Sequence, residues 1–129
     1  MTRFALAALL FAACGGDDGG GVTADAAKTP DAATNKVVAV TCPTTADATV
    51  MTTNGSFSFM PAATPLALNG VVKFVMSSEH NVVPNTIAPM TDPGLMVNFG
   101  ETKCLKFTAV GTFGFACGPH SFAGTVTVQ

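Results

Sequence analysis

Short alternating runs of apolar and small residues are the feature that most limits how this chain can fold. Phe113, Phe115 and Cys117 alternate with small residues, and valine alternates with threonine over residues 125–128. This period of two is typical of a β-strand with one buried face. Beyond residue 13, no apolar i, i+3, i+4 pattern persists for ten residues, so the pattern predicts no long helix.

Turn signals separate these runs along the chain. Asn54-Gly55 and Asn69-Gly70 are favoured two-residue turns, and the first predicts a hairpin that continues into residues 56–59. About six to eight short strands at this spacing predict an all-β protein, an antiparallel sandwich or barrel. The clearest strand candidates are residues 36–41, 49–52, 56–59, 71–76, 102–108, 112–116 and 123–128.

The N-terminus has the pattern of an export signal. Arg3 supplies a positive charge, and residues 4–13 form an apolar run that ends in small residues, so we predict a signal peptide over residues 1–13. The run is too short to cross a bilayer, which needs about 20 residues in a helix. Residues 10–14 resemble a bacterial lipoprotein signal, in which the cysteine, here Cys14, is lipidated. The alternative is ordinary export with cleavage near residue 13, and both place the protein in the periplasm or at the cell surface.

A flexible linker is predicted between this signal and the folded domain. Residues 14–35 consist mainly of Gly, Asp, Ala and Thr, and Val22 is the only large aliphatic residue among them. Such a segment cannot bury enough apolar area to offset the entropy lost on ordering. As a coil, its ends would lie on the order of 25 Å apart. We therefore predict that the folded domain spans residues 36–129 and is tethered to a membrane through Cys14.

The charge of the predicted domain excludes one class of partner. From Lys36 onward the sequence holds four lysines, four carboxylates and no arginine, so the net charge is zero. A nucleic-acid-binding protein needs a basic stripe to neutralise phosphates, and this sequence has none. We expect no nucleic-acid partner.

One cysteine and two histidines form a candidate metal site. Cys117 ends an alternating run, Gly118-Pro119 turns the chain, and His120 follows. His80 is the only other histidine of the chain. Two imidazoles and one thiolate are the trigonal ligand set of a blue-copper electron-transfer site.

The order of features from residue 57 to residue 128 resembles the cupredoxins, the plastocyanin, amicyanin and azurin group of small copper proteins. The resemblance implies a Greek-key β-sandwich with one Cu(I)/Cu(II) ion at one end, held by His80, Cys117 and His120. It also implies that Asn81 ties the His80 loop to the ligand loop near the sulfur. The resembling parts are Phe59-Met60-Pro61, residues 69–74, His80-Asn81-Val82, Gly100-Glu101-Thr102 and residues 111–120.

The sequence departs from this family at the weak axial ligand. A methionine normally follows the second histidine by a few residues, but residues 121–125 contain none. The axial position is then either without a strong ligand, with Phe122 or Ala123 packed there, or filled from elsewhere. A missing donor favours Cu(I), so we expect a higher reduction potential than in a Met-ligated site. The donors that could fill the position are the Glu79 carbonyl, Met96 and Met90.

The two remaining cysteines predict a disulfide. With Cys14 assigned to a lipid and Cys117 to copper, Cys42 and Cys104 are left, an even remainder in an exported chain. Cys104 alternates with Leu105 and shares its strand face with polar residues. We therefore expect the bridge to lie near the surface.

The resulting expectation is a monomeric electron carrier that docks transiently with redox proteins. The predicted docking patch is the apolar surface around Pro119, Phe122 and Pro84, which suits the small interfaces of such encounters. Copper storage or delivery through the same ligands is the first alternative, and a metal-free adhesion or structural module is the second. The sequence indicates neither a second metal nor a substrate-sized polar pocket, so we do not expect an enzyme.

Overall fold

The structure is a computed structural model, and it describes residues 35–129. The predicted signal peptide (1–13), Cys14 and the predicted linker up to residue 34 lie outside the described residues. No helix within residues 35–129 has the length and apolar character needed to cross a membrane.

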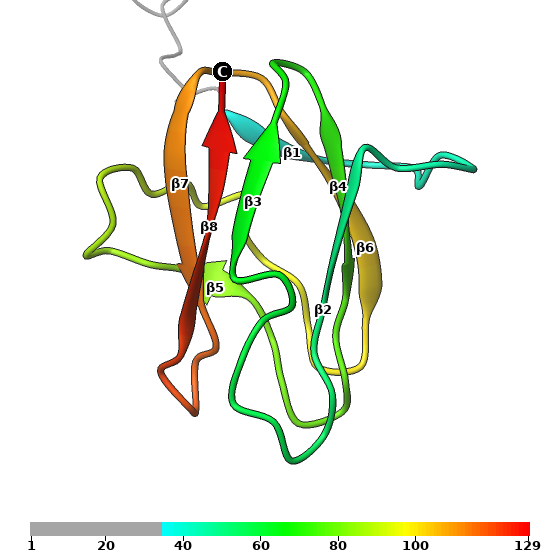
Figure 1. Cartoon of the computed structure of the whole chain (residues 1–129), viewed down its shortest axis with the longest axis vertical. Helices are drawn as coiled ribbons and strands as arrows, with labels where there is room; N and C mark the ends of the chain where they lie inside the picture. The colour runs from blue at the N-terminus through cyan, green and yellow to red at the C-terminus, as the bar shows by residue number, and fades with distance from the viewer. Residues whose placement is uncertain (1–34) are drawn as a thin grey trace, which may run out of the picture. The chain divides into compact units, whose positions relative to one another are not determined.

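Residues 35–129 form eight short strands in two four-stranded sheets that pack face to face (Figure 1). One sheet has the order β1-β6-β4-β2 and the other β3-β8-β7-β5. The predicted all-β sandwich is therefore confirmed. The strands are β1 (Val37–Val40), β2 (Ala48–Met51), β3 (Ala63–Leu66), β4 (Val71–Val75), β5 (Val83–Pro84), β6 (Thr102–Phe107), β7 (Gly111–Ala116) and β8 (Ala123–Val128).

The core lies between the two sheets and follows the alternation seen in the sequence. Val72 and Phe74 of β4 are fully buried, whereas Lys73 between them is partly exposed. Four phenylalanines pack edge to face in two pairs across the layer: Phe74 lies 5.4 Å from Phe115, and Phe107 lies 5.4 Å from Phe113, measured between ring centroids. Burial of such rings supplies much of the apolar area that stabilises a sandwich of this size.

Two strand pairings are parallel, which the expectation of a purely antiparallel sandwich did not include. β2 pairs with β4, and β3 pairs with β8, both in parallel. The Asn69-Gly70 turn explains part of this arrangement, because it joins β3 and β4, which belong to different sheets. Asn69 has a positive φ of 68°, and the N–H of Gly70 donates to the carbonyl of Ala67 at 2.9 Å. The turn thus carries the chain from one layer to the other and closes no hairpin.

The predicted hairpin at Asn54-Gly55 is wrong in its second half. The turn forms, and the N–H of Ser56 donates to the carbonyl of Thr53 at 3.2 Å. Residues 56–59 form no strand, and only an isolated bridge between Met51 and Met60 pairs the two sides. The segment leaves the sheet because Phe59 enters the core, where it is 2% exposed.

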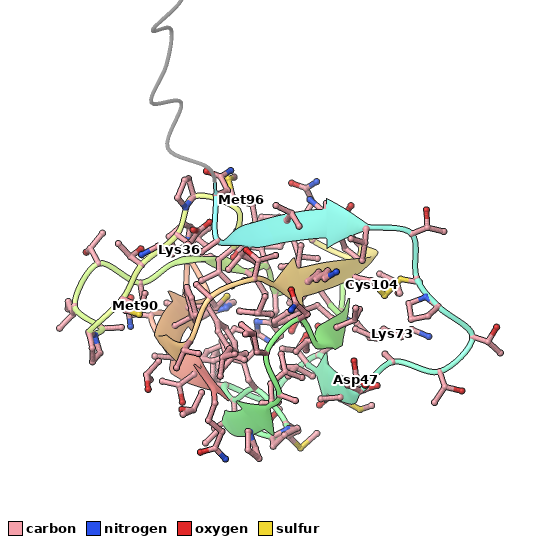
Figure 2. The ribbon with its side chains drawn as sticks, turned by 90° about the horizontal axis from the view of Figure 1, so that it is seen from above. Lys36, Asp47, Lys73, Met90, Met96 and Cys104 are labelled. Carbon is pink, nitrogen blue, oxygen red and sulfur yellow. A yellow bond between two sulfur atoms is a disulfide. The ribbon has the colours of Figure 1, made fainter. Side chains whose placement is uncertain are left out.

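The predicted disulfide between Cys42 and Cys104 is present, with the two Cα atoms 5.1 Å apart. Its burial differs from the expectation at one end: Cys42 is exposed, but Cys104 is only 1% exposed. β6 is an inner strand between β1 and β4, so neighbouring strands flank Cys104 even on the outer face of the sheet. Its register partner on β4 is Lys73, which Figure 2 shows beside it.

Removing this disulfide should destabilise the metal-free protein. The bridge spans 62 positions, and the loop-entropy account assigns about 4 kcal/mol to a loop of that length. We expect the double variant Cys42→Ser/Cys104→Ser to lose about this much unfolding free energy in urea denaturation. Thr45→Ser, in the same exposed segment, serves as the control and should lose almost none. A loss below about 1 kcal/mol would contradict the entropic account.

Candidate metal centre

Three loops meet at the end of the sandwich opposite the C-terminus (Figure 1). His80 lies in the loop between β4 and β5, Cys117 directly follows β7, and His120 lies in the turn between β7 and β8. The third loop, between β2 and β3, is bonded to the His80 loop through the backbone N–H of Gly55. Residues separated by up to 40 positions are thereby brought to one point.

The three predicted ligands converge with their donor atoms facing one another. The two Nδ1 atoms of His80 and His120 lie 3.1 Å apart, and each is 3.7 Å from the Sγ of Cys117. A triangle with these sides has a centre about 2 Å from each corner, close to the bond lengths of about 2.0–2.3 Å that Zn²⁺ makes to imidazole and thiolate. Within residues 35–129, this is the one group of three His, Cys, Asp or Glu side chains close enough to share an ion.

Burial differs sharply among the three side chains. His80 is fully buried and Cys117 is 1% exposed, whereas His120 is exposed. An ion at this point would therefore be shielded from water on the side of the sheets and approached from outside only past His120. The Nε2 of His80 is buried without a hydrogen-bond partner among the described residues, so packing rather than a hydrogen bond orients this ring.

Aromatic rings supply that packing. Phe122 stands edge-on to His80 at 5.1 Å and nearly parallel to His120 at 6.4 Å, measured between ring centroids. Phe59 contacts Phe122 at 4.7 Å and Phe115 at the same distance. A continuous set of ring contacts therefore links the core to the two imidazoles.

Backbone hydrogen bonds close the ligand loop tightly. The N–H of Cys117 donates to the carbonyl of Phe122, and the N–H of Ser121 donates to the carbonyl of Cys117, each at 2.9 Å. Ser121 has a positive φ of 58°. These bonds hold the turn closed. They thereby keep the imidazole of His120 near the sulfur of Cys117, which lies three residues earlier in the chain.

Asn81 bonds to the same loop. Its side-chain Oδ1 accepts a hydrogen bond from the N–H of Gly118 at 2.9 Å. Asn81 directly follows one ligand and Gly118 directly follows another. The contact joins the two ligand-bearing loops beside the sulfur.

The two methionines suggested as axial ligands, Met90 and Met96, lie in different parts of the fold. Met90 packs over Gly111 at the far end of β7, and six residues of strand separate that glycine from Cys117, about 20 Å. The suggestion of Met90 as axial donor is therefore wrong. Met96 is 51% exposed, and its carbonyl accepts from Lys103 Nζ at 2.8 Å; Figure 2 shows it on the side where Lys36 begins the domain.

The other candidates for the axial position also lie in different surroundings. Glu79, whose carbonyl is one candidate donor, uses its side-chain carboxylate to accept from the N–H of Gly55 at 2.8 Å. Ala123 is exposed at the start of β8. Phe122 is the member of this set whose side chain packs on both imidazoles.

Phe57 is a site residue that the sequence reasoning missed. Its ring lies edge-on to His120 at 4.9 Å and to His80 at 6.3 Å, yet 64% of the side chain is exposed. The alternating segment around it was interpreted as a strand, in which Phe57 and Phe59 would share a buried face. No local signal in the sequence distinguishes the two rings, because the contact depends on a loop folding across the end of the sandwich.

Comparison with known proteins points to one family. The family model of copper binding proteins, plastocyanin/azurin family, matches residues 40–129. Among solved structures, amicyanin from Paracoccus versutus (Thiobacillus versutus) aligns with a TM-score of 0.56 and 18% identity, over 74% of this chain and 99% of that chain. An oxidised methionine-to-lysine mutant of amicyanin aligns with a TM-score of 0.54 and 21% identity, over 74% of this chain and all of that chain. No curated protein sequence matches the chain.

A two-sheet sandwich with a buried thiolate and two imidazoles at one end has the architecture of a cupredoxin. The chain belongs to the plastocyanin/azurin family of copper-binding proteins. Its donor set fits one type 1 copper ion, because a soft thiolate suits Cu(I) and imidazoles suit both oxidation states.

Loss of the Asn81 contact should weaken copper binding. Asn81→Ala leaves the N–H of Gly118 without this acceptor and unties the two ligand loops. Removal of such outer contacts lowers metal affinity about 10–100-fold, and we expect this range in competition with a Cu(I) chelator. Asn81→Asp keeps an acceptor oxygen and should retain most of the affinity. Asn85→Ala is the matched control, since Asn85 caps only its own turn through Ile87; equal affinities for Asn81→Ala and this control would contradict the role.

Proposed function

We propose that this protein is an exported one-electron carrier that cycles a single copper ion between Cu(I) and Cu(II). The convergence of the Nδ1 atoms of His80 and His120 on the Sγ of Cys117 is the observation that carries the proposal. Each ligand is attached to the end of a sheet or to a loop closed by hydrogen bonds. A centre held in this way changes little in geometry between oxidation states, which lowers the reorganisation needed for electron transfer.

His120 is the proposed electron port. It is the exposed member of the ligand set, and the exposed Phe57 and Pro119 lie beside it in space or in sequence. Phe122 and Pro84, the other members of the predicted patch, are partly buried. A small apolar surface suits a partner that binds and leaves quickly.

The proposed centre has no strong axial ligand. Phe122 packs on both imidazoles and carries no donor atom, which supports this form over one with a thioether from Met96 or the carbonyl of Glu79. A missing axial donor stabilises Cu(I) relative to Cu(II). The proposal therefore includes a reduction potential above that of a Met-ligated relative.

Copper storage or delivery is the second candidate function. It would use the same three ligands but would require that copper leave readily. The burial of His80 and Cys117 favours the carrier over this alternative, because an ion held by two buried donors has a restricted exit. No enzymatic activity forms part of either proposal.

The proposal for the N-terminus rests on sequence alone. From the sequence we propose residues 1–13 as a signal peptide, Cys14 as the lipidation site, residues 14–35 as a linker and residues 36–129 as the copper domain. The protein would work as a monomer in the periplasm or at the cell surface, docking with redox proteins. The mass of the mature protein from its native membrane fraction tests lipidation at Cys14.

Spectroscopy and electron exchange together test the carrier function. Copper-loaded protein should have an intense visible band from thiolate-to-Cu(II) charge transfer, and Cys117→Ser should abolish it, because the sulfur is the source of the transition. The Cys42→Ser/Cys104→Ser variant, which keeps Cys117, should retain the band. A carrier should also exchange electrons rapidly between oxidised and reduced copies without losing copper to a chelator. Slow exchange together with ready copper loss would favour storage or delivery.

The axial proposal predicts the effect of a new donor beside the imidazoles. Phe122→Met places a thioether where the ring now packs, and the reduction potential should fall, because the added donor stabilises Cu(II). Redox titration monitored through the visible band measures the change. Ile87→Met, at a 92% exposed position, is the control and should leave the potential unchanged. An unchanged or higher potential in Phe122→Met would contradict an open axial position.

A further inference from the structure

Phe57 is an exposed aromatic side chain that lies against two metal ligands. Its ring meets the ring of His120 at 4.9 Å with an interplanar angle of 76°, and it reaches His80 at 6.3 Å. Both imidazoles in turn lie within 3.7 Å of the Cys117 sulfur. The side chain is 64% exposed, so one side of the ring packs on the imidazoles while the other faces solvent.

The turn that carries Phe57 is fastened to the His80 loop at its tip. The N–H of Gly55 donates to the carboxylate Oε2 of Glu79 at 2.8 Å. The side-chain amide of Asn54 donates to the hydroxyl of Ser78 at 2.9 Å. Both contacts are exposed, and their partners Ser78 and Glu79 lie two residues and one residue before the ligand His80.

The base of the same turn is held independently of these two contacts. Thr52 is buried, and its Oγ1 accepts from the N–H of Ser77 at 2.9 Å. On the other side, Phe59 is buried in the core and Met60 pairs with Met51. Residues 53–57 therefore form the tip of a loop whose two ends are held by contacts separate from those to Ser78 and Glu79.

We infer that residues 53–57 are a latched cover that can swing away from the copper centre, and that Phe57 sets how readily solvent and reagents pass His120 to reach the buried thiol of Cys117. The latch is the pair of exposed hydrogen bonds to Ser78 and Glu79. When these bonds break, the ring leaves His120 and the thiol of Cys117 gains access to solvent from the one side that the sheets do not shield. Phe57 is in this sense a positioning residue, since it carries no donor atom for the metal.

The inference concerns access to the metal ligands of this chain and does not depend on the proposed electron-carrier role. The ring of Phe57 contacts His80 and His120 directly, so the cover can be tested without a metal. Reactivity of Cys117 in the metal-free protein therefore reports the cover directly, without any measurement of electron transfer. A failure of the carrier proposal would appear in the electron-exchange rate, and a failure of the cover would appear in the thiol reaction.

The first test measures alkylation of Cys117 by iodoacetamide in the metal-free full-length chain, followed by mass spectrometry of the peptide that contains Cys117. Phe57→Ala should raise the alkylation rate about tenfold. Removing one aromatic contact of ordinary strength changes the equilibrium between the closed and open positions of the loop by about that factor. Phe57→Leu keeps an apolar side chain of similar reach and should restore most of the protection. Ile87→Ala removes another exposed apolar side chain, in the loop after β5, and should leave the rate unchanged.

The second test acts on the latch and leaves Phe57 in place. Glu79→Ala removes the acceptor for the N–H of Gly55 and should also raise the alkylation rate, whereas Glu79→Gln keeps an acceptor oxygen and should stay near the wild-type value. In copper-loaded protein, the variants that speed alkylation should lose copper faster to a chelator in the same order, with the visible band at an unchanged wavelength. Rates for Phe57→Ala and Glu79→Ala within twofold of wild type would overturn the inference. Equal acceleration by Ile87→Ala would overturn it as well, because the effect would then not be local to the cover.

Discussion

Packing of aromatic rings between the two sheets is the interaction on which the copper centre depends. Phe74 meets Phe115 at 5.4 Å, Phe115 meets Phe59 at 4.7 Å, and Phe59 meets Phe122 at 4.7 Å, between ring centroids. Phe122 then packs on the buried ring of His80. The orientation of the ligand is thereby set by the core itself, since its Nε2 finds no hydrogen-bond partner among residues 35–129.

This arrangement divides the centre into a rigid inner side and an accessible outer side. The sheets and rings enclose His80 and Cys117, while His120 remains exposed in a turn closed by two backbone hydrogen bonds. A centre with one exposed ligand can pass an electron to a docked partner without opening its inner side. The loop that carries Phe57 lies over that outer side, so the proposed docking patch and the proposed cover share one small surface.

Local patterns in the sequence predicted the strands and the kinds of donor atom. Alternation correctly indicated that Phe113 and Phe115 of β7 are buried, and the cysteine count led to the disulfide that the structure contains. The pattern failed where burial depends on distant segments. Residues 56–59 alternate like a strand but turn away from the sheet, and Cys104 is covered because β6 has neighbours on both sides.

The sequence by itself determined that the chain would form short strands and that one thiol and two imidazoles were the candidate ligands, because these properties belong to single residues and their immediate neighbours. Only the tertiary structure decided that the Nδ1 atom of His80 would lie within 3.7 Å of the donor atoms of Cys117 and His120, which come 37 and 40 positions later in the chain. It also decided that β2 would pair in parallel with β4 and β3 with β8, and that Phe57 would lie on His120. Such contacts form between segments far apart in the chain, and their geometry follows from how two whole sheets pack, which no local period records.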